Sequence, residues 1–202
     1  MKLSHCLSAI ALACLPALGS AAPITYTFTG TAEVQSEGST GSQLVDFSLV
    51  INAFTTGVYE FDSNVYINDA VSNVFTYGSN AATSLTNVGL YVGIEQLNAP
   101  VGVTFGFADD GDWLKMGISG APDSAGLDTY ELDSNFGPYT VTSPAFTGGV
   151  PLYLASGGSL NFLNLTSATF TATLDNAVPE PGSFALAGLA LAGLALTRRR
   201  KA

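Results

Sequence analysis

Histidine and cysteine are missing from residues 23–202, because His5, Cys6 and Cys14 all lie in an apolar segment at the N-terminus. Without imidazole or thiol groups, residues 23–202 contain no Ser-His-Asp or Cys-His nucleophile, no imidazole general base and no histidine-ligated zinc site. They also contain no disulfide. We therefore expect a protein without catalytic activity.

Basic residues are equally scarce. Between residues 23 and 178, Lys115 stands against fifteen acidic residues, which gives this region a net charge of −14. A surface of that sign repels phosphate backbones and anionic lipid headgroups. The charge therefore excludes nucleic acid as a partner.

Sustained helical patterns are absent from the same region. Ile24, Tyr26 and Phe28 alternate with threonines, a period of two that is typical of a half-buried strand. Short runs of this kind, bounded by turn residues, occupy residues 24–32, 44–51, 58–61, 65–67, 71–77, 85–97, 101–107, 113–118, 127–132, 139–142, 150–154, 159–165 and 168–174. They predict an all-β domain over residues 23–177, built as an antiparallel two-sheet sandwich that is jelly-roll-like.

Residues 1–22 have the order of a secretory signal peptide. Lys2 provides a positive start, residues 3–18 are apolar apart from a few interruptions, and small residues continue to Ala22. Cleavage after Ala21 or after Ala22 fits this pattern, although the second choice would leave Pro23 as the first residue. The segment predicts a signal helix and export of the chain.

Residues 178–202 combine a polar motif, an apolar run over residues 184–197 and a basic end. Fourteen helical residues span about 21 Å, which is less than the ~30 Å hydrocarbon core of a bilayer. We therefore expect a short transmembrane helix that anchors weakly, with the basic end retained in the cytoplasm. The motif is Pro179, Glu180 and Pro181, and the basic cluster is Arg198, Arg199, Arg200 and Lys201.

On those residues, the tail resembles the PEP-CTERM sorting signal of exopolysaccharide-producing Gram-negative bacteria. The resemblance covers about the last 25 residues and implies recognition by exosortase, a membrane transpeptidase. It also implies transit through the inner membrane, followed by delivery to the cell surface or the extracellular matrix. The opening and closing strands, residues 128–132 and Gly137-Pro138 are similar to PEP-CTERM proteins without known activity. A permanent tail anchor is the alternative interpretation of the same helix.

Acidic residues are densest around the Asp-Asp-Gly-Asp sequence of residues 109–112. Calcium takes about six to eight oxygen ligands, which clustered carboxylates and turn carbonyls provide. The spacing matches neither the EF-hand loop nor the RTX repeat, so a solvated acidic loop is the competing interpretation. The group consists of Asp109, Asp110 and Asp112, followed by Asp123, Asp128, Glu131 and Asp133. We expect no other cofactor.

Together these features predict an exported, acidic, all-β surface or matrix protein with a structural or adhesive role. A polysaccharide-binding module is an alternative, since β-sandwiches of this kind bind sugars and the tail implies a polysaccharide context. Trp113 is the single tryptophan available for sugar stacking. A carboxylate-based glycan hydrolase is a weaker alternative, because fifteen acids produce close pairs in any fold.

Overall fold

The computed structural model describes residues 21–62, 65–87, 89–95, 102–109, 112–119, 126–142 and 151–175. The expected signal helix and the expected C-terminal helix lie outside these residues. Within the described residues, none forms a helix that is long and apolar enough to cross a membrane. The folded body runs from Ala22 to Asp175 as one compact unit.

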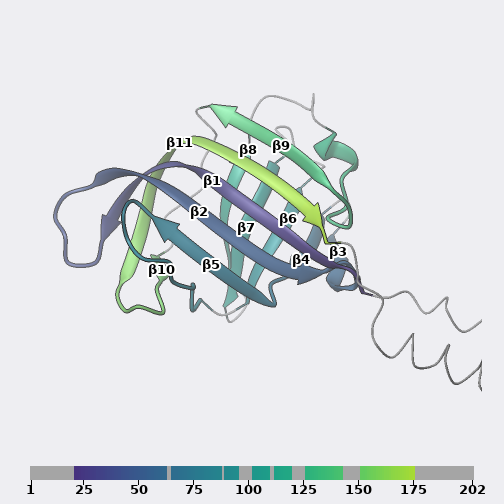
Figure 1. Cartoon of the computed structure of the whole chain (residues 1–202), viewed down its shortest axis with the longest axis horizontal. Helices are drawn as coiled ribbons and strands as arrows, with labels where there is room; N and C mark the ends of the chain where they lie inside the picture. Colours follow the sequence, from purple (N-terminus) through teal and green to yellow (C-terminus); the bar gives the residue numbers. More distant parts are fainter. Residues whose placement is uncertain are drawn as a thin grey trace, which may run out of the picture. The chain divides into compact units, whose positions relative to one another are not determined.

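The body is made of two antiparallel sheets, shown one in front of the other in Figure 1. The front sheet has six strands: β1 (Pro23–Ser36), β2 (Gln43–Phe54), β5 (Ser72–Tyr77), β9 (Phe136–Thr142), β10 (Pro151–Tyr153) and β11 (Ser159–Leu174). The back sheet has five: β3 (Val58–Asp62), β4 (Val65–Asp69), β6 (Leu90–Glu95), β7 (Gly102–Asp109) and β8 (Asp112–Ser119). Two short 3-10 turns, η2 (Thr55–Gly57) and η3 (Leu127–Thr129), complete the described elements.

The prediction of an all-β antiparallel two-sheet sandwich is confirmed. The six-stranded sheet has the order β10-β11-β1-β2-β5, with β9 also paired to β11, and the five-stranded sheet has the order β3-β4-β6-β7-β8. Five of the nine neighbouring pairs are consecutive strands, and the other four, β1–β11, β2–β5, β9–β11 and β4–β6, join strands that are farther apart in the chain. The jelly-roll-like part of the prediction stays a prediction.

Four of the predicted strands need correction. Residues 127–132 form the turn η3 and a loop, although Leu127 and Leu132 are fully buried. The side chains of Leu127 and Leu132 pack into the core although neither residue belongs to a sheet. A short apolar run in the sequence looks the same in such a loop as in a buried strand. Residues 159–165 and 168–174 form the single strand β11, which carries two register shifts opposite β1 that break its alternation. The strand predicted at residues 85–97 begins only at Leu90.

The core lies between the two sheets and is rich in aromatic rings. Alternate residues of β1 point into it, as the period of two predicts. The ring of Phe28 contacts that of Phe105 on β7 at a centroid distance of 5.1 Å and that of Phe170 on β11 at 5.0 Å. These rings join the two sheets, so Phe28 and its neighbours hold the sandwich together.

The first and last strands of the body are neighbours. Ile24 pairs with Leu174, and the register continues along β1 and β11 as far as Ser36 and Leu160. Beyond the last pair, the Asp175 amide donates a hydrogen bond to the Pro23 carbonyl at 2.9 Å. The chain therefore enters and leaves the body at the same point.

Gly30 is required by this pairing. A Cβ at residue 30 would lie 2.1 Å from the carbonyl oxygen of Ser167 and 3.0 Å from the Cα of Ala168, both on β11. We expect Gly30→Ala to lower the free energy of unfolding by about 2–3 kcal/mol, because the clashing atoms are backbone and cannot rotate away. Urea unfolding of the full chain measures this change.

Gly41→Ala is the matched control, because a Cβ there meets no atom within 4 Å. It should leave the urea midpoint within the range of ordinary surface substitutions. Equal midpoints for the two variants would show that β11 moves aside at no cost and would contradict the prediction.

Candidate functional site

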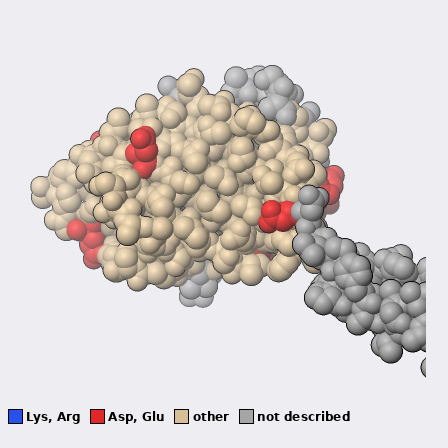
Figure 2. All heavy atoms as spheres, in the orientation of Figure 1, with Lys and Arg blue, Asp and Glu red and all other residues tan. Residues whose placement is uncertain are grey.

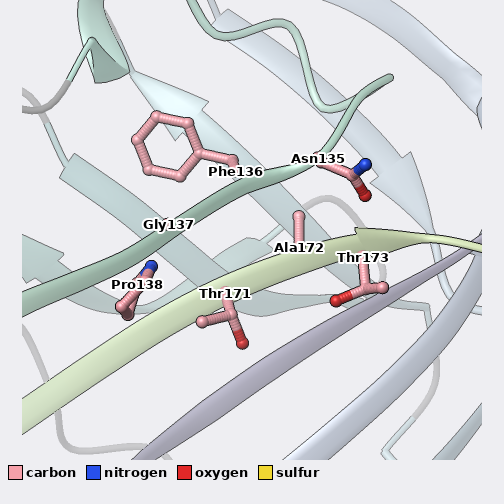
Figure 3. Close-up of a pocket in the computed structure, with 7 residues that line it drawn as sticks. All are labelled: Asn135, Phe136, Gly137, Pro138, Thr171, Ala172 and Thr173. Carbon is pink, nitrogen blue, oxygen red and sulfur yellow. The ribbon is translucent and has the colours of Figure 1, made fainter.

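An open depression lies beside the register shift between β9 and β11 (Figure 3). The two strands pair regularly from Ser167 and Thr142 to Phe170 and Tyr139, and then the register shifts before Ala172 meets Phe136. The resulting hollow has a volume of about 630 Å³, which is within the usual range of ligand pockets. Its lining residues are Asn135, Phe136, Gly137, Pro138, Thr171, Ala172 and Thr173.

Gly137 and Pro138 lie at this register shift, between Phe136 and Tyr139 of β9. Gly137 has a φ of +91°, a left-handed conformation that glycine adopts without steric cost. A Cβ at Gly137 would also lie 2.6 Å from the Phe170 carbonyl oxygen. Pro138 has no amide hydrogen and contributes no donor to the ladder with β11. The Gly-Pro pair therefore interrupts the ladder within β9 beside the depression, while Gly137 allows the two backbones to approach closely.

Asn135 closes one end of the depression. Its side-chain oxygen accepts a hydrogen bond from the Leu174 amide at 2.5 Å, which ties the start of β9 to the end of β11. The ring of Phe136 stacks on Tyr130 with centroids 4.5 Å apart. Each contact restrains one lining residue of the depression, Asn135 or Phe136.

The lining carries no charged side chain. Thr171 and Thr173 provide hydroxyl groups, Asn135 provides an amide, and Phe136 and Pro138 provide apolar surface. Hydroxyl and amide groups both donate and accept hydrogen bonds, whereas neither acts as a general acid or base near neutral pH. The depression is therefore suited to an uncharged polar ligand and holds no carboxylate pair for hydrolysis.

A buried hydrogen-bond network supports the core behind this region. The Tyr26 hydroxyl donates to the Leu132 carbonyl at 2.5 Å. The Asn68 amide nitrogen donates to the Tyr26 oxygen at 2.7 Å and to the Phe54 carbonyl at 3.2 Å. Asn68 is 0% exposed and is the single buried polar residue in the described part of the chain. The network links β1, β2, β4 and the loop before β9, which is a structural role.

Tyr26 and Tyr130 both have raised pKa values. Burial raises the pKa of Tyr26 far above 10; the Asn68 hydrogen bond opposes this shift and the charge of Asp133 adds to it. Burial also raises the pKa of Tyr130 strongly, with smaller contributions from Tyr26 and Asp133. Both phenols therefore remain neutral hydrogen-bond donors at neutral pH, and neither is poised to act as a base.

The predicted calcium residues meet only in part. Asp109 of β7 pairs with Asp112 of β8 at the end of a hairpin, an arrangement for which an intervening Asp-Gly is a common sequence. Asp110, Asp123 and the side chains of Asp109, Asp112 and Asp128 lie outside the described part, while Glu131 and Asp133 are exposed in the loop before β9. The described residues contain no group of three potential ligands suited to a metal. Calcium binding stays a prediction.

The residues predicted for processing fall at the two ends of the body. Ala21 and Ala22 precede β1, and the Ala22 amide donates to the Thr55 hydroxyl at 3.3 Å. The Thr55 amide in turn donates to the Ala22 carbonyl at 3.0 Å, so Ala22 is part of the folded body. The sorting motif and the basic cluster lie outside the described residues: Pro179, Glu180, Pro181, Arg198, Arg199, Arg200 and Lys201.

Comparison with known proteins identifies the tail. A family model described as the PEP-CTERM protein-sorting motif matches residues 177–201, so the chain carries this motif. The motif indicates export with transit at the membrane, and it implies processing by an exosortase. No curated protein and no solved structure matches the chain. The likeness of the body to other PEP-CTERM proteins therefore stays a prediction.

Proposed function

We propose that this chain is a surface or extracellular-matrix protein whose folded body has a structural or adhesive role and no catalytic one. The observation that carries the proposal is the sorting motif at residues 177–201, which begins two positions after the body ends at Asp175. A sorting signal joined so closely to a single compact body makes that body the delivered cargo. The final destination we propose is the cell surface or the matrix around it.

The position of the chain ends supports display of the body. Pro23 and Asp175 are hydrogen-bonded neighbours, so both connections reach the body at one point. After removal of the signal peptide, a single linker holds the body at that point. This arrangement places the link to the sorting motif at one end of the first and last strands.

The chemistry of the body favours contact over catalysis. Residues 23–202 contain no histidine and no cysteine, and the depression is lined by neutral residues. The lining residues of the depression fit an adhesive site for an uncharged ligand better than they fit an active centre. A carboxylate-based glycan hydrolase is correspondingly less favoured, since no acidic residue lines the depression.

Deletion of residues 178–202 tests the proposal. We expect the surface-associated fraction of the protein to fall several-fold, with the body recovered in soluble fractions, because the exosortase then has no motif to recognise. Glu180→Gln should act in the same direction, since it neutralises the acidic residue of the motif. Immunoblots of fractionated cells measure both effects.

Asp69→Asn, an exposed neutralising substitution within the body, is the matched control and should fractionate as the original chain does. Unchanged fractionation after deletion of the tail would overturn the proposal. If the protein hydrolyses a polysaccharide, and if substitution of a single carboxylate residue abolishes that hydrolysis, the proposal that the body is not catalytic is wrong.

A further inference from the structure

The outward side of the six-stranded sheet carries a regular threonine array. Thr25, Thr27 and Thr29 alternate with buried residues along β1, and Thr169, Thr171 and Thr173 do so along β11. The register pairs them directly: Thr25 with Thr173, Thr27 with Thr171 and Thr29 with Thr169. We call these six residues the threonine ladder.

The spacing of this ladder follows from strand geometry. Neighbouring strands lie about 4.8 Å apart, and alternate residues along a strand recur about every 6.7 Å. The ladder therefore presents hydroxyl and methyl groups in two fixed directions. Thr140 on β9 extends it on one side, with its hydroxyl 2.9 Å from that of Thr169. Ser48, Val50 and Asn52 on β2 continue the same rows on the other.

Several of these side chains are held in place before a ligand arrives. The Thr25 hydroxyl donates to the Asn52 side-chain oxygen at 3.1 Å, and the Asn52 amide donates to the Ser72 hydroxyl at 3.0 Å. β-Branched threonine is also stiff at χ1. Each threonine hydroxyl retains acceptor capacity after one donated bond, so the array remains able to bind further hydroxyl groups at a low entropic cost.

The ladder is continuous with the depression, because Thr171 and Thr173 belong to both. Charge is absent from the ladder and from the lining of the depression; the next row along β1 brings in Asp46, which accepts a hydrogen bond from Thr31 at 2.7 Å. Figure 2 views this face and shows its central part without acidic residues. In a body of net charge −14, this is a neutral surface.

We propose that the threonine ladder and the adjoining depression bind an extended, neutral polysaccharide. One sugar unit occupies the depression against Pro138 and Thr171, which lie on the same side of the two strands (Figure 3), and the following units lie along the ladder, where threonine hydroxyls exchange hydrogen bonds with sugar hydroxyls. This inference rests on the proposed adhesive function and names its ligand class. Repeating hydroxyl groups on an uncharged chain match both the hydrogen-bonding groups and the lack of charge of this surface.

Other occupants fit this surface less well. Stable contacts between two copies of a chain have apolar centres, whereas the ladder is made of hydroxyl-bearing residues. Anionic lipid headgroups, nucleic acids and acidic polysaccharides carry the same sign of charge as the body and are repelled. A neutral glycan avoids this repulsion and also supplies the hydrogen-bonding partners.

Retention of the full-length protein on insoluble polysaccharides tests the inference, with cellulose, chitin and curdlan as neutral probes and an alginate gel as the acidic one. We expect retention on at least one neutral probe and weaker retention on alginate. The triple variant Thr27→Val, Thr169→Val and Thr171→Val should bind at least about tenfold more weakly, because three hydroxyl contacts are lost. Valine preserves shape and strand preference, and urea unfolding verifies that the variant is folded.

Thr56→Val is the matched control, because Thr56 is exposed in η2 and belongs neither to the ladder nor to the lining of the depression. It should bind as the original chain does. Absence of retention on every neutral probe, equal binding of the triple variant, or a preference for alginate would each overturn the inference. Such a failure is separate from failure of the proposed function, since the triple variant keeps its tail and its cell fractionation is measured independently.

Discussion

Replacing Phe170 with alanine is expected to lower the free energy of unfolding by about 3–5 kcal/mol, the usual cost of removing a fully buried aromatic ring. Phe170 is 0% exposed and lies at the centre of the aromatic core. Its ring centroid is 5.0 Å from that of Phe28, 6.2 Å from Tyr26, 6.3 Å from Tyr130 and 6.1 Å from Phe136. The cavity would therefore open between both sheets and beneath the depression.

Urea unfolding of the full chain measures this loss, and Leu163→Ala is its control on the same strand. Leu163 is 48% exposed at a register shift of β11, so its truncation should cost far less than that of Phe170. If the two alanine variants unfold at the same urea concentration, the aromatic core does not hold the sandwich as described. Binding by Phe170→Ala would not decide this question, because the variant retains every lining residue of the depression.

Stability is expected to fall steeply above pH 10. An unfolded tyrosine loses its proton near pH 10, whereas Tyr26 and Tyr130 keep theirs in the fold because burial raises their pKa values. Above pH 10 the unfolded state therefore binds fewer protons than the native state, and the stability that is fully present below pH 10 declines. Each tyrosine contributes a slope of about −1.4 kcal/mol per pH unit, which amounts to about 4 kcal/mol for the pair at pH 11.5.

Urea unfolding at a series of pH values from 7 to 11.5 measures this slope. The Tyr26→Phe variant starts from a lower stability, because it leaves the Asn68 amide without the tyrosine oxygen as acceptor. Its decline above pH 10 should nevertheless be shallower by about 1.4 kcal/mol per unit. A variant and an original chain with parallel pH profiles would show that Tyr26 ionises in the native state as it does in water.

The sequence predicted the strands that have one buried face. In β1, Ile24, Tyr26 and Phe28 alternate with threonine and lie in the core as expected. The pattern failed where apolar residues serve the core without belonging to a sheet, as Leu127 and Leu132 do. A short apolar run indicates that its side chains are buried. Buried side chains occur both in strands and in loops that pack on the core, so the run alone does not predict which of the two forms.

The depression was beyond sequence analysis because it depends on pairing between distant residues. Gly137-Pro138 is visible as an interruption within a run of strand residues. Its consequence appears only once β9 lies against β11 and Thr171 faces the interruption. The threonine alternation was equally visible, but the ladder exists only because β1 and β11 are neighbours, which no local pattern indicates.

The sorting tail was predictable for the opposite reason. A processing enzyme reads a linear peptide, so the order of Pro179, Glu180, Pro181, an apolar run and a basic end carries the signal without any fold. Linear signals are accessible to sequence analysis, and surfaces assembled from several strands are not.

The pairing of the first strand with the last also sets a sequence of events in time. Contacts between residues at opposite ends of a chain raise the contact order, and a high contact order slows folding. β1 has β2 on one side and β11 on the other, so its ladder is complete only when the last strand of the body is in place. The residues that finish the sheet are therefore the ones that lead directly into the sorting motif.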